Sequence, residues 1–225
     1  MKRIYFISGL GADKNAFIKI RDFSGYEKVF LDWKKNQQKE SLDNYIARLT
    51  EGHEISNNDI LIGLSFGGIV AMSIARRFGV RTVVLISSFM SAKNLRPLMR
   101  ILINSRSYYL LPPLKMKRVR TFFRHYFSST SGEGNEVLAS MVAASDVRLS
   151  KWSIDQIRKC QHASYESIEV HNIIGARDRI VNTWENERTH ILQNGGHFMV
   201  YENADEINKL LLSIIQNSDL RKESD

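Results

Sequence analysis

The chain has 225 residues, of which 43% are hydrophobic and 25% are charged, and this ordinary composition excludes the disordered and fibrous classes. A chain of this length buries roughly 70% of its unfolded surface in one core, and its single cysteine, Cys160, excludes an internal disulfide and a cysteine-based zinc site. The net charge of +8 comes from one segment, because residues 93–126 hold nine lysines and arginines and no acidic residue.

The first residues have the charge order of a signal peptide, with Lys2 and Arg3 ahead of an apolar run. That run ends at Ser8-Gly9 without a convincing cleavage site. No stretch approaches the roughly 18 uninterrupted apolar residues of a membrane span. We therefore expect a cytoplasmic protein whose first strand lies at this end of the chain.

Short apolar and β-branched runs, each bounded by Gly, Asp, Ser or Asn, predict strands that are buried on both faces. They span residues 3–8, 28–31, 60–64, 82–86, 168–174 and 188–192. Apolar residues at helical spacing predict helices between the strands, for example at residues 42–49 behind a Ser41 cap and from Ile207 onward. Strands that alternate with helices predict a parallel α/β sheet.

Two segments depart from this alternation. Residues 91–165 contain no predicted strand and carry aromatic and leucine clusters among basic residues, which predicts a helical insertion. Residues 219–225 are mostly charged and are expected to form a disordered tail. The predicted organisation is a core of residues 1–90 and 166–218, the insertion at 91–165 and the tail.

The sequence Gly63-Leu64-Ser65-Phe66-Gly67 lies between a predicted buried strand and an apolar helix. This context is the one that a nucleophile elbow requires, because its serine occupies a strained turn and its glycines avoid Cβ clashes. The alternative is a glycine-rich connection in another doubly wound fold. Ser65 is therefore the candidate nucleophile.

A serine hydroxyl needs a base to take its proton and an acid to orient that base. Asp178 follows the predicted strand at 168–174, so its carboxylate should project from the carboxyl edge of the sheet. His197 follows the last predicted strand, on a loop whose Gly195 and Gly196 let the imidazole approach Ser65. The chain order Ser, Asp, His is that of one known triad lineage.

Each partner also has a plain structural interpretation, since an Asp after a strand is usually a turn or cap residue and a lone His is usually structural. The elbow, the chain order and the placement at strand ends together favour the catalytic interpretation. The remaining histidines fall in helix ends, the insertion or strand interiors and compete poorly for the role: His53, His125, His162, His171 and His190.

An acyl-transfer site also needs donors for the oxyanion, normally backbone N–H groups that are already fixed in place. Phe66, directly after the candidate nucleophile, can supply one. The loop at residues 8–13 can supply the other, with Leu10 as the expected donor. The same loop also fits a tight strand-to-helix turn, which is compatible with this role.

The sequence resembles the α/β-hydrolase family through residues 63–68, 175–179 and 195–198, and the resemblance covers residues 2–90 and 167–217. It implies Ser65 as nucleophile, Asp178 as acid and His197 as base, with Leu10 and Phe66 forming the oxyanion hole. It also implies that the insertion is a helical cap over the site. We expect no metal and no cofactor.

Two departures from the family pattern affect the expected fold. Ser8 stands where many members have a histidine, which concerns the support of the oxyanion loop. The chain also starts at a strand and loop that match the family's third strand. The expected fold is therefore an α/β-hydrolase fold with a trimmed, mostly parallel sheet of about six strands, helices on both faces and a cap insertion.

The family includes esterases, thioesterases, lipases, peptidases and non-catalytic receptors, so the fold does not settle the substrate. A serine nucleophile disfavours the dehalogenase and epoxide branches, which use a carboxylate. We expect a serine hydrolase that cleaves a small-molecule carboxylic ester or thioester through an acyl-enzyme. The alternative is a non-catalytic receptor that binds a small molecule in its pocket.

The basic insertion offers a hint of a partner, because positive charges among apolar residues suit an acidic acyl carrier, a coenzyme A thioester or an anionic lipid surface. Arg118, Arg120 and Arg124 are the candidate substrate-binding residues. The alternative is a solvated outer face of the cap helices. No recognised module indicates binding of specific nucleic acid sequences.

Overall fold

The computed structural model describes residues 2–106, 109, 121, 125–127, 130–160 and 167–222. Within them, six strands form one sheet in the order β2-β1-β3-β4-β5-β6, and each neighbouring pair is parallel. The strands are β1 (Lys2–Ile7), β2 (Tyr26–Phe30), β3 (Ile60–Leu64), β4 (Thr82–Ile86), β5 (Glu169–Gly175) and β6 (Thr189–Leu192). The predicted parallel sheet of six strands is confirmed.

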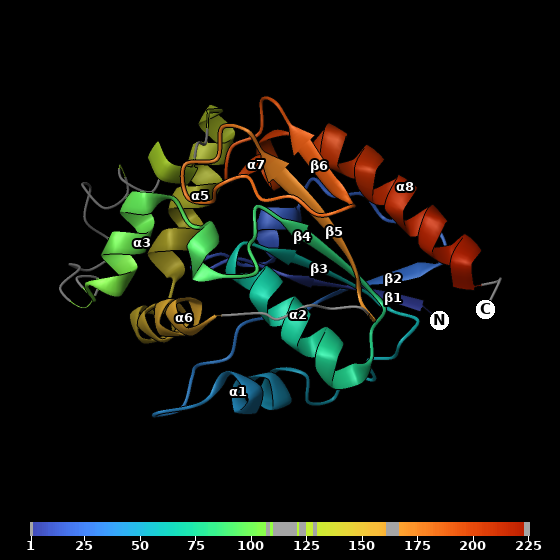
Figure 1. The fold of residues 1–225 in the computed structure, drawn as a ribbon, viewed down its shortest axis with the longest axis horizontal. Helices are drawn as coiled ribbons and strands as arrows, with labels where there is room; N and C mark the ends of the chain where they lie inside the picture. The colour runs from blue at the N-terminus through green and yellow to red at the C-terminus, as the bar shows by residue number, and fades with distance from the viewer. Residues whose placement is uncertain are drawn as a thin grey trace.

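Helices cover both faces of the sheet (Figure 1). In the described chain they are η1 (Lys14–Phe17), α1 (Leu42–Leu49), α2 (Phe66–Phe78), η2 (Ala92–Asn94), α3 (Pro97–Asn104), α5 (Gly132–Ala144), α6 (Val147–Lys159), α7 (Met199–Glu202) and α8 (Ala204–Lys222). Ser41 caps α1 by accepting the Asn44 N–H, as the sequence predicts. None of the helices described here is both long and apolar enough to cross a membrane.

Side chains alternate between the two faces of each strand, and this alternation divides the core in two. In β1, Ile4 and Phe6 pack in the cluster that includes η1, α7 and α8. Tyr5 and Ile7, from the same strand, pack in the cluster that includes α1 and α2. The central strands are therefore buried on both faces, which explains why their sequences are continuous apolar runs.

The strand order creates a switch point beside β1. Because β1 lies between β2 and β3, the chain leaves β1 toward one side of the sheet and later returns on the other side. A crevice forms beyond the carboxyl ends of the strands at such a point, and ligand sites of open α/β sheets lie there. The loop at residues 8–13 and the turn at Ser65 both border it.

Gly67 determines how closely α2 approaches β1 at this switch point. A Cβ atom at Gly67 would lie 2.2 Å from the backbone oxygen of Ile7 and 2.4 Å from that of Ser8. Backbone atoms of a central strand have no room to give way, so only glycine permits this approach. Gly67 therefore allows the turn that carries Ser65 to lie against the loop that follows β1.

The insertion predicted at residues 91–165 is helical through most of its described part, which includes η2, α3, α5 and α6. Figure 1 shows α3, α5 and α6 gathered beyond the carboxyl ends of the strands. Trp152 of α6 joins the core, because its ring lies 4.5 Å from that of Tyr45 and its Nε1 donates to the Glu40 carbonyl at 2.8 Å. This placement supports a cap, and the domain boundaries stay a prediction.

The C-terminal segment differs from the disordered tail expected at residues 219–225. Helix α8 continues to Lys222, and residues 223–225 lie outside the described residues. The Asp219 carboxylate accepts hydrogen bonds from Lys2 Nζ at 2.6 Å and Tyr26 Oη at 2.7 Å. These contacts hold the last turns of the helix against β1 and β2, and charge composition does not reveal such distant partners.

Candidate active site

Ser65 lies at the turn between β3 and α2, in a backbone conformation that few residues other than glycine adopt. Its φ is 51° and its ψ is −120°, a strained region that persists only where the surroundings impose it. The Ser65 N–H donates to the Ile86 carbonyl at 2.9 Å, and the Ser88 hydroxyl donates to the Ser65 carbonyl at 2.6 Å. The end of β4 therefore holds the turn that presents Ser65.

His197 connects Ser65 to Asp178. Its Nε2 lies 3.0 Å from Ser65 Oγ, and its Nδ1 lies 2.8 Å from Asp178 Oδ2. His197 and Asp178 are each 1% exposed, whereas Ser65 is partly exposed. The structure thus brings together the three residues that the sequence analysis selected, in the order that lets a base take the serine proton.

The Asp178 carboxylate is held in place by its own loop and by the insertion. Oδ1 accepts the N–H groups of Ile180 at 2.8 Å and Val181 at 2.9 Å, while Oδ2 faces His197. Arg96, at the start of the insertion, donates through Nε to the Asp178 carbonyl at 3.1 Å. The sequence analysis counts Arg96 only as part of a basic segment, because a contact across 82 residues leaves no local pattern.

Phe127, which the sequence analysis did not select, packs against the candidate base. Its ring centroid lies 5.0 Å from that of His197, with the two planes at 90°. The Phe127 carbonyl accepts the Phe198 N–H at 2.9 Å, and Arg179 Nη1 donates to the His125 carbonyl at 3.1 Å. Residues 125–127 therefore contact the loops of both the candidate base and the candidate acid.

The loop at residues 8–13 passes directly beside Ser65, since a Cβ at Gly9 would lie 3.3 Å from Ser65 Cβ. The Ser8 hydroxyl braces this loop by donating to the Ala12 carbonyl at 2.9 Å. Within the described residues, the Leu10 N–H donates no hydrogen bond. The Phe66 N–H, first in α2, has no acceptor inside the helix. Neither expected oxyanion donor therefore has a hydrogen-bond acceptor within the described residues.

Aromatic contacts fix Phe66 and link it to the insertion. The Trp33 ring stacks on Phe66 at 5.5 Å and 22°, and Trp152 of α6 meets Phe66 edge-on at 6.2 Å. Trp152 is held in turn by the Glu40 carbonyl. The Glu40 side chain, 2% exposed, binds Arg48 at 2.8 Å, and hydrogen bonds from Arg48 lower the pKa of this carboxyl. The backbone at Phe66 is thereby held from the insertion side as well.

The candidate substrate-binding residues Arg118, Arg120 and Arg124 lie outside the described residues. Other basic residues of the segment are described, and the exposed ones among them are Lys93, Arg100 and Arg106. Within the described part of the chain, no group of three or more His, Cys, Asp or Glu side chains is arranged to hold a metal ion.

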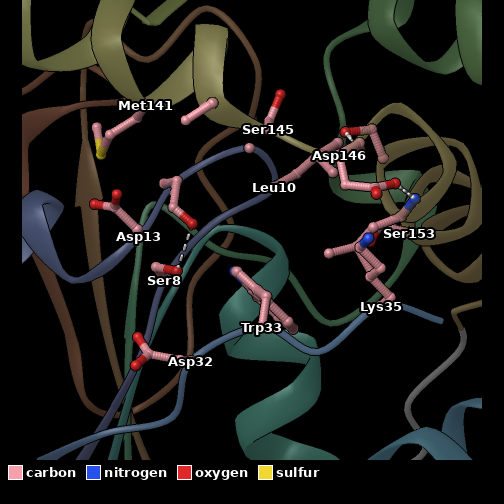
Figure 2. A pocket seen from close by; sticks show the side chains of 15 residues that line it. Ser8, Leu10, Asp13, Asp32, Trp33, Lys35, Met141, Ser145, Asp146 and Ser153 are labelled. Atoms are coloured by element: carbon pink, nitrogen blue, oxygen red, sulfur yellow. Dashed lines mark hydrogen bonds between the residues drawn. The ribbon is translucent and has the colours of Figure 1, made fainter.

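A cavity of about 310 Å³ borders the site (Figure 2). Its walls come from the loop at residues 8–13, from residues 32–35 after β2, and from the facing ends of α5 and α6. Leu10 and Trp33 connect the cavity to the candidate active site, because Leu10 belongs to the loop beside Ser65 and Trp33 stacks on Phe66. The sequence analysis did not select Trp33 or the acidic residues of these walls.

A family model described as the alpha/beta hydrolase family matches residues 22–210. A hydrolase from Oleispira antarctica has 17% identity and a TM-score of 0.73, covering 96% of this chain and 92% of that chain. A thermophilic esterase from Thermogutta terrifontis has 13% identity and a TM-score of 0.76, covering 97% and 90%. An esterase from Exiguobacterium antarcticum has 12% identity and a TM-score of 0.69, covering 96% and 92%. No curated protein shows a significant sequence match.

The edge-to-face contact of Phe127 with His197 should keep the imidazole aligned for Ser65. We expect Phe127→Ala to slow the phosphonylation of Ser65 by a fluorophosphonate about two- to tenfold, since such ring pairs contribute about 0.5–1.5 kcal/mol. Phe127→Tyr retains the ring and should react at close to the wild-type rate. Intact-protein mass spectrometry measures the labelling, and an unchanged rate in folded Phe127→Ala would contradict the positioning role.

Proposed function

Because the chain belongs to the alpha/beta hydrolase family, we propose that it is a serine hydrolase of carboxylic esters or thioesters. The observation that carries this proposal is the pair of hydrogen bonds from Ser65 through His197 to Asp178. The similar folds of two solved structures described as esterases support an ester as the substrate.

In the proposed reaction, His197 Nε2 takes the proton of Ser65 Oγ as that oxygen attacks the substrate carbonyl. The N–H groups of Leu10 and Phe66 would donate to the oxyanion that forms. The imidazolium then gives its proton to the leaving alkoxide or thiolate, which departs as alcohol or thiol and leaves Ser65 acylated. A water molecule, deprotonated by His197, attacks the acyl group and releases the acid.

The burial of the two partners of Ser65 supports this assignment. With Nδ1–H donated to Asp178, the Nε2 lone pair is directed at the serine hydroxyl, which is the tautomer that a base requires. The imidazolium that forms would lie beside a carboxylate in a water-poor environment, where their attraction is stronger than in water. Asp178 would therefore both orient His197 and stabilise its charged form.

A non-catalytic receptor that has kept the fold is the rival function. It would use the cavity as a binding pocket and would not need a reactive serine. Rapid labelling of Ser65 by a fluorophosphonate would support the hydrolase, because this reaction requires a base beside the serine. A chain that binds small molecules but leaves the probe unreacted would support the receptor.

We expect Ser65→Ala to remain folded and to lose hydrolysis of p-nitrophenyl butyrate by at least about 10³-fold, because removing the nucleophile of a triad costs several powers of ten. Ser73→Ala is the matched control, since Ser73 lies on α2 and donates only to the Ile69 carbonyl one turn earlier. Activity above about 10% of wild type in folded Ser65→Ala would refute Ser65 as the nucleophile.

Replacing Asp178 with Asn should favour the wrong His197 tautomer, with a proton on Nε2, and lower the rate by a factor on the order of 10⁴. Asp155→Asn and Asp205→Asn remove the same charge away from His197 and should stay close to wild type. Steady-state hydrolysis of the same ester measures all three variants. If Asp178→Asn kept its rate while one of the others lost it, the acid would be misassigned.

An anionic partner is a separate proposal, carried by the exposed Lys93, Arg100 and Arg106 in a segment without acidic residues. An acidic acyl carrier or an anionic lipid surface fits this charge. Exposed charges are screened over roughly 8 Å at physiological ionic strength, so turnover of an anionic substrate should fall steeply with added salt. Hydrolysis of a neutral ester should change little, and equal salt effects on both would refute the partner.

A further inference from the structure

We propose that the cavity beside the loop at residues 8–13 binds a protonated primary amine or a guanidinium group of the substrate. This inference rests on the proposed hydrolase function and names its substrate class. The cavity volume of about 310 Å³ falls at the lower end of small-molecule sites. A group of this size and chemistry can be part of the same molecule as the scissile ester, because Leu10 belongs to both the cavity wall and the loop beside Ser65.

Three carboxylates line the cavity, from Asp13, Asp32 and Asp146. Asp13 Oδ1 accepts the Asn15 N–H at 2.8 Å, and Asp146 Oδ1 accepts the Leu149 N–H at 2.9 Å. Within the described chain, Asp32 is exposed and forms no hydrogen bond or ion pair. Each carboxylate can therefore still accept hydrogen bonds from a ligand.

The hydroxyl groups of the cavity add to this excess of acceptors. Three of them donate to backbone carbonyls at 2.8–2.9 Å, namely Ser8 to Ala12, Ser145 to Val142 and Ser150 to Asp146. A hydroxyl that has donated its one hydrogen offers only lone pairs to a further partner. Toward a ligand, these serines therefore act as acceptors.

Donors on the walls are few. Lys35 provides an ammonium group, the Leu10 N–H donates to no acceptor among the described residues, and the Trp33 Nε1–H is buried without a partner among them. Figure 2 shows Asp13 and Asp32 on one side of the cavity and Lys35 with Asp146 on the other, so Lys35 lies away from two of the three carboxylates. The Asp13 and Asp32 side is the part best suited to a cation.

A ligand with a positive charge and several N–H donors would pair with the carboxylate and hydroxyl oxygens on the cavity walls. An ammonium group brings three donors and a guanidinium five, and hydrogen bonds between a cation and a carboxylate are the stronger kind. The Trp33 ring offers a further favourable contact to a cation. An anionic group in this position would meet two or three like charges, although the chain as a whole carries +8.

Calorimetry with the full chain carrying Ser65→Ala tests the cavity without turnover. Hexylammonium should bind at least about tenfold more tightly than hexanol, because a charged N–H donor forms stronger hydrogen bonds with carboxylates than a neutral hydroxyl does. Hexyltrimethylammonium has the charge but no N–H donor and should also bind less tightly than hexylammonium. Hexanol and the quaternary ion thus separate the contribution of charge from that of hydrogen bonding.

Further substitutions of Asp13 and Asp32 locate the binding. Asp13→Asn combined with Asp32→Asn should weaken hexylammonium binding about tenfold or more, and asparagine at position 13 can still cap η1. Asp43→Asn is the matched control, because Asp43 is an exposed acid of the first turn of α1 outside the cavity walls. This control should leave the affinity unchanged.

Hexylammonium that binds no more tightly than hexanol, or that is weakened equally by Asp43→Asn, would overturn the amine site. Equal affinity for hexyltrimethylammonium would overturn the role of the N–H donors. The hydrolase proposal is judged separately, by the loss of p-nitrophenyl butyrate hydrolysis in Ser65→Ala. Ester hydrolysis that depends on Ser65 without selective amine binding would refute the amine site and leave the hydrolase standing.

Discussion

The Ser65 hydroxyl reaches His197 because the backbone at Ser65 is held at a φ of 51°. Nothing in the serine itself favours that conformation, so the surrounding structure must impose it. Strand β4 does so through the hydrogen bonds of Ile86 and Ser88 to the Ser65 backbone. Gly67 contributes by letting α2 lie against the end of β1. The neighbouring strands β1, β3 and β4 therefore together determine the position of the candidate nucleophile.

The same close packing determines what can lie around Ser65. The end of β1 is so near α2 that the chain beyond it must pass beside the serine, and this brings Gly9 and Leu10 to the candidate site. Next to this loop, Trp33 stacks on Phe66, and Trp152 of α6 contacts the same Phe66 ring edge-on. The insertion thus contacts the residue after the nucleophile as well as His197 and Asp178. A movement of the insertion would therefore displace side chains that contact Phe66, His197 and Asp178.

The sheet and the three candidate catalytic residues could be predicted from the sequence because their signals are local. A buried strand reads as an apolar run, and Ser65, Asp178 and His197 each follow such a run beside glycines. Parallel strands then bring the three ends to one edge without further information. Arg96 and Phe127 could not be found in this way, since their contacts with the site depend on how the insertion folds back over the sheet. The end of α8 was not predicted for the same reason, because Asp219 accepts hydrogen bonds from Lys2 and Tyr26, which lie far away in the sequence.

The net charge of the chain is positive, whereas the side chains around the cavity carry a net negative charge. The excess of +8 arises in residues 93–126, whereas the cavity beside Leu10 has three carboxylates and one ammonium group on its walls. Exposed charges act over roughly a Debye length of 8 Å, and groups that face a confined cavity are screened less. The exposed Lys93, Arg100 and Arg106 would therefore act on which molecules approach, and the carboxylates of the cavity on which group the proposed site binds. A substrate suited to both would carry its negative charge far from the ester and a hydrogen-bond-donating cation close to it.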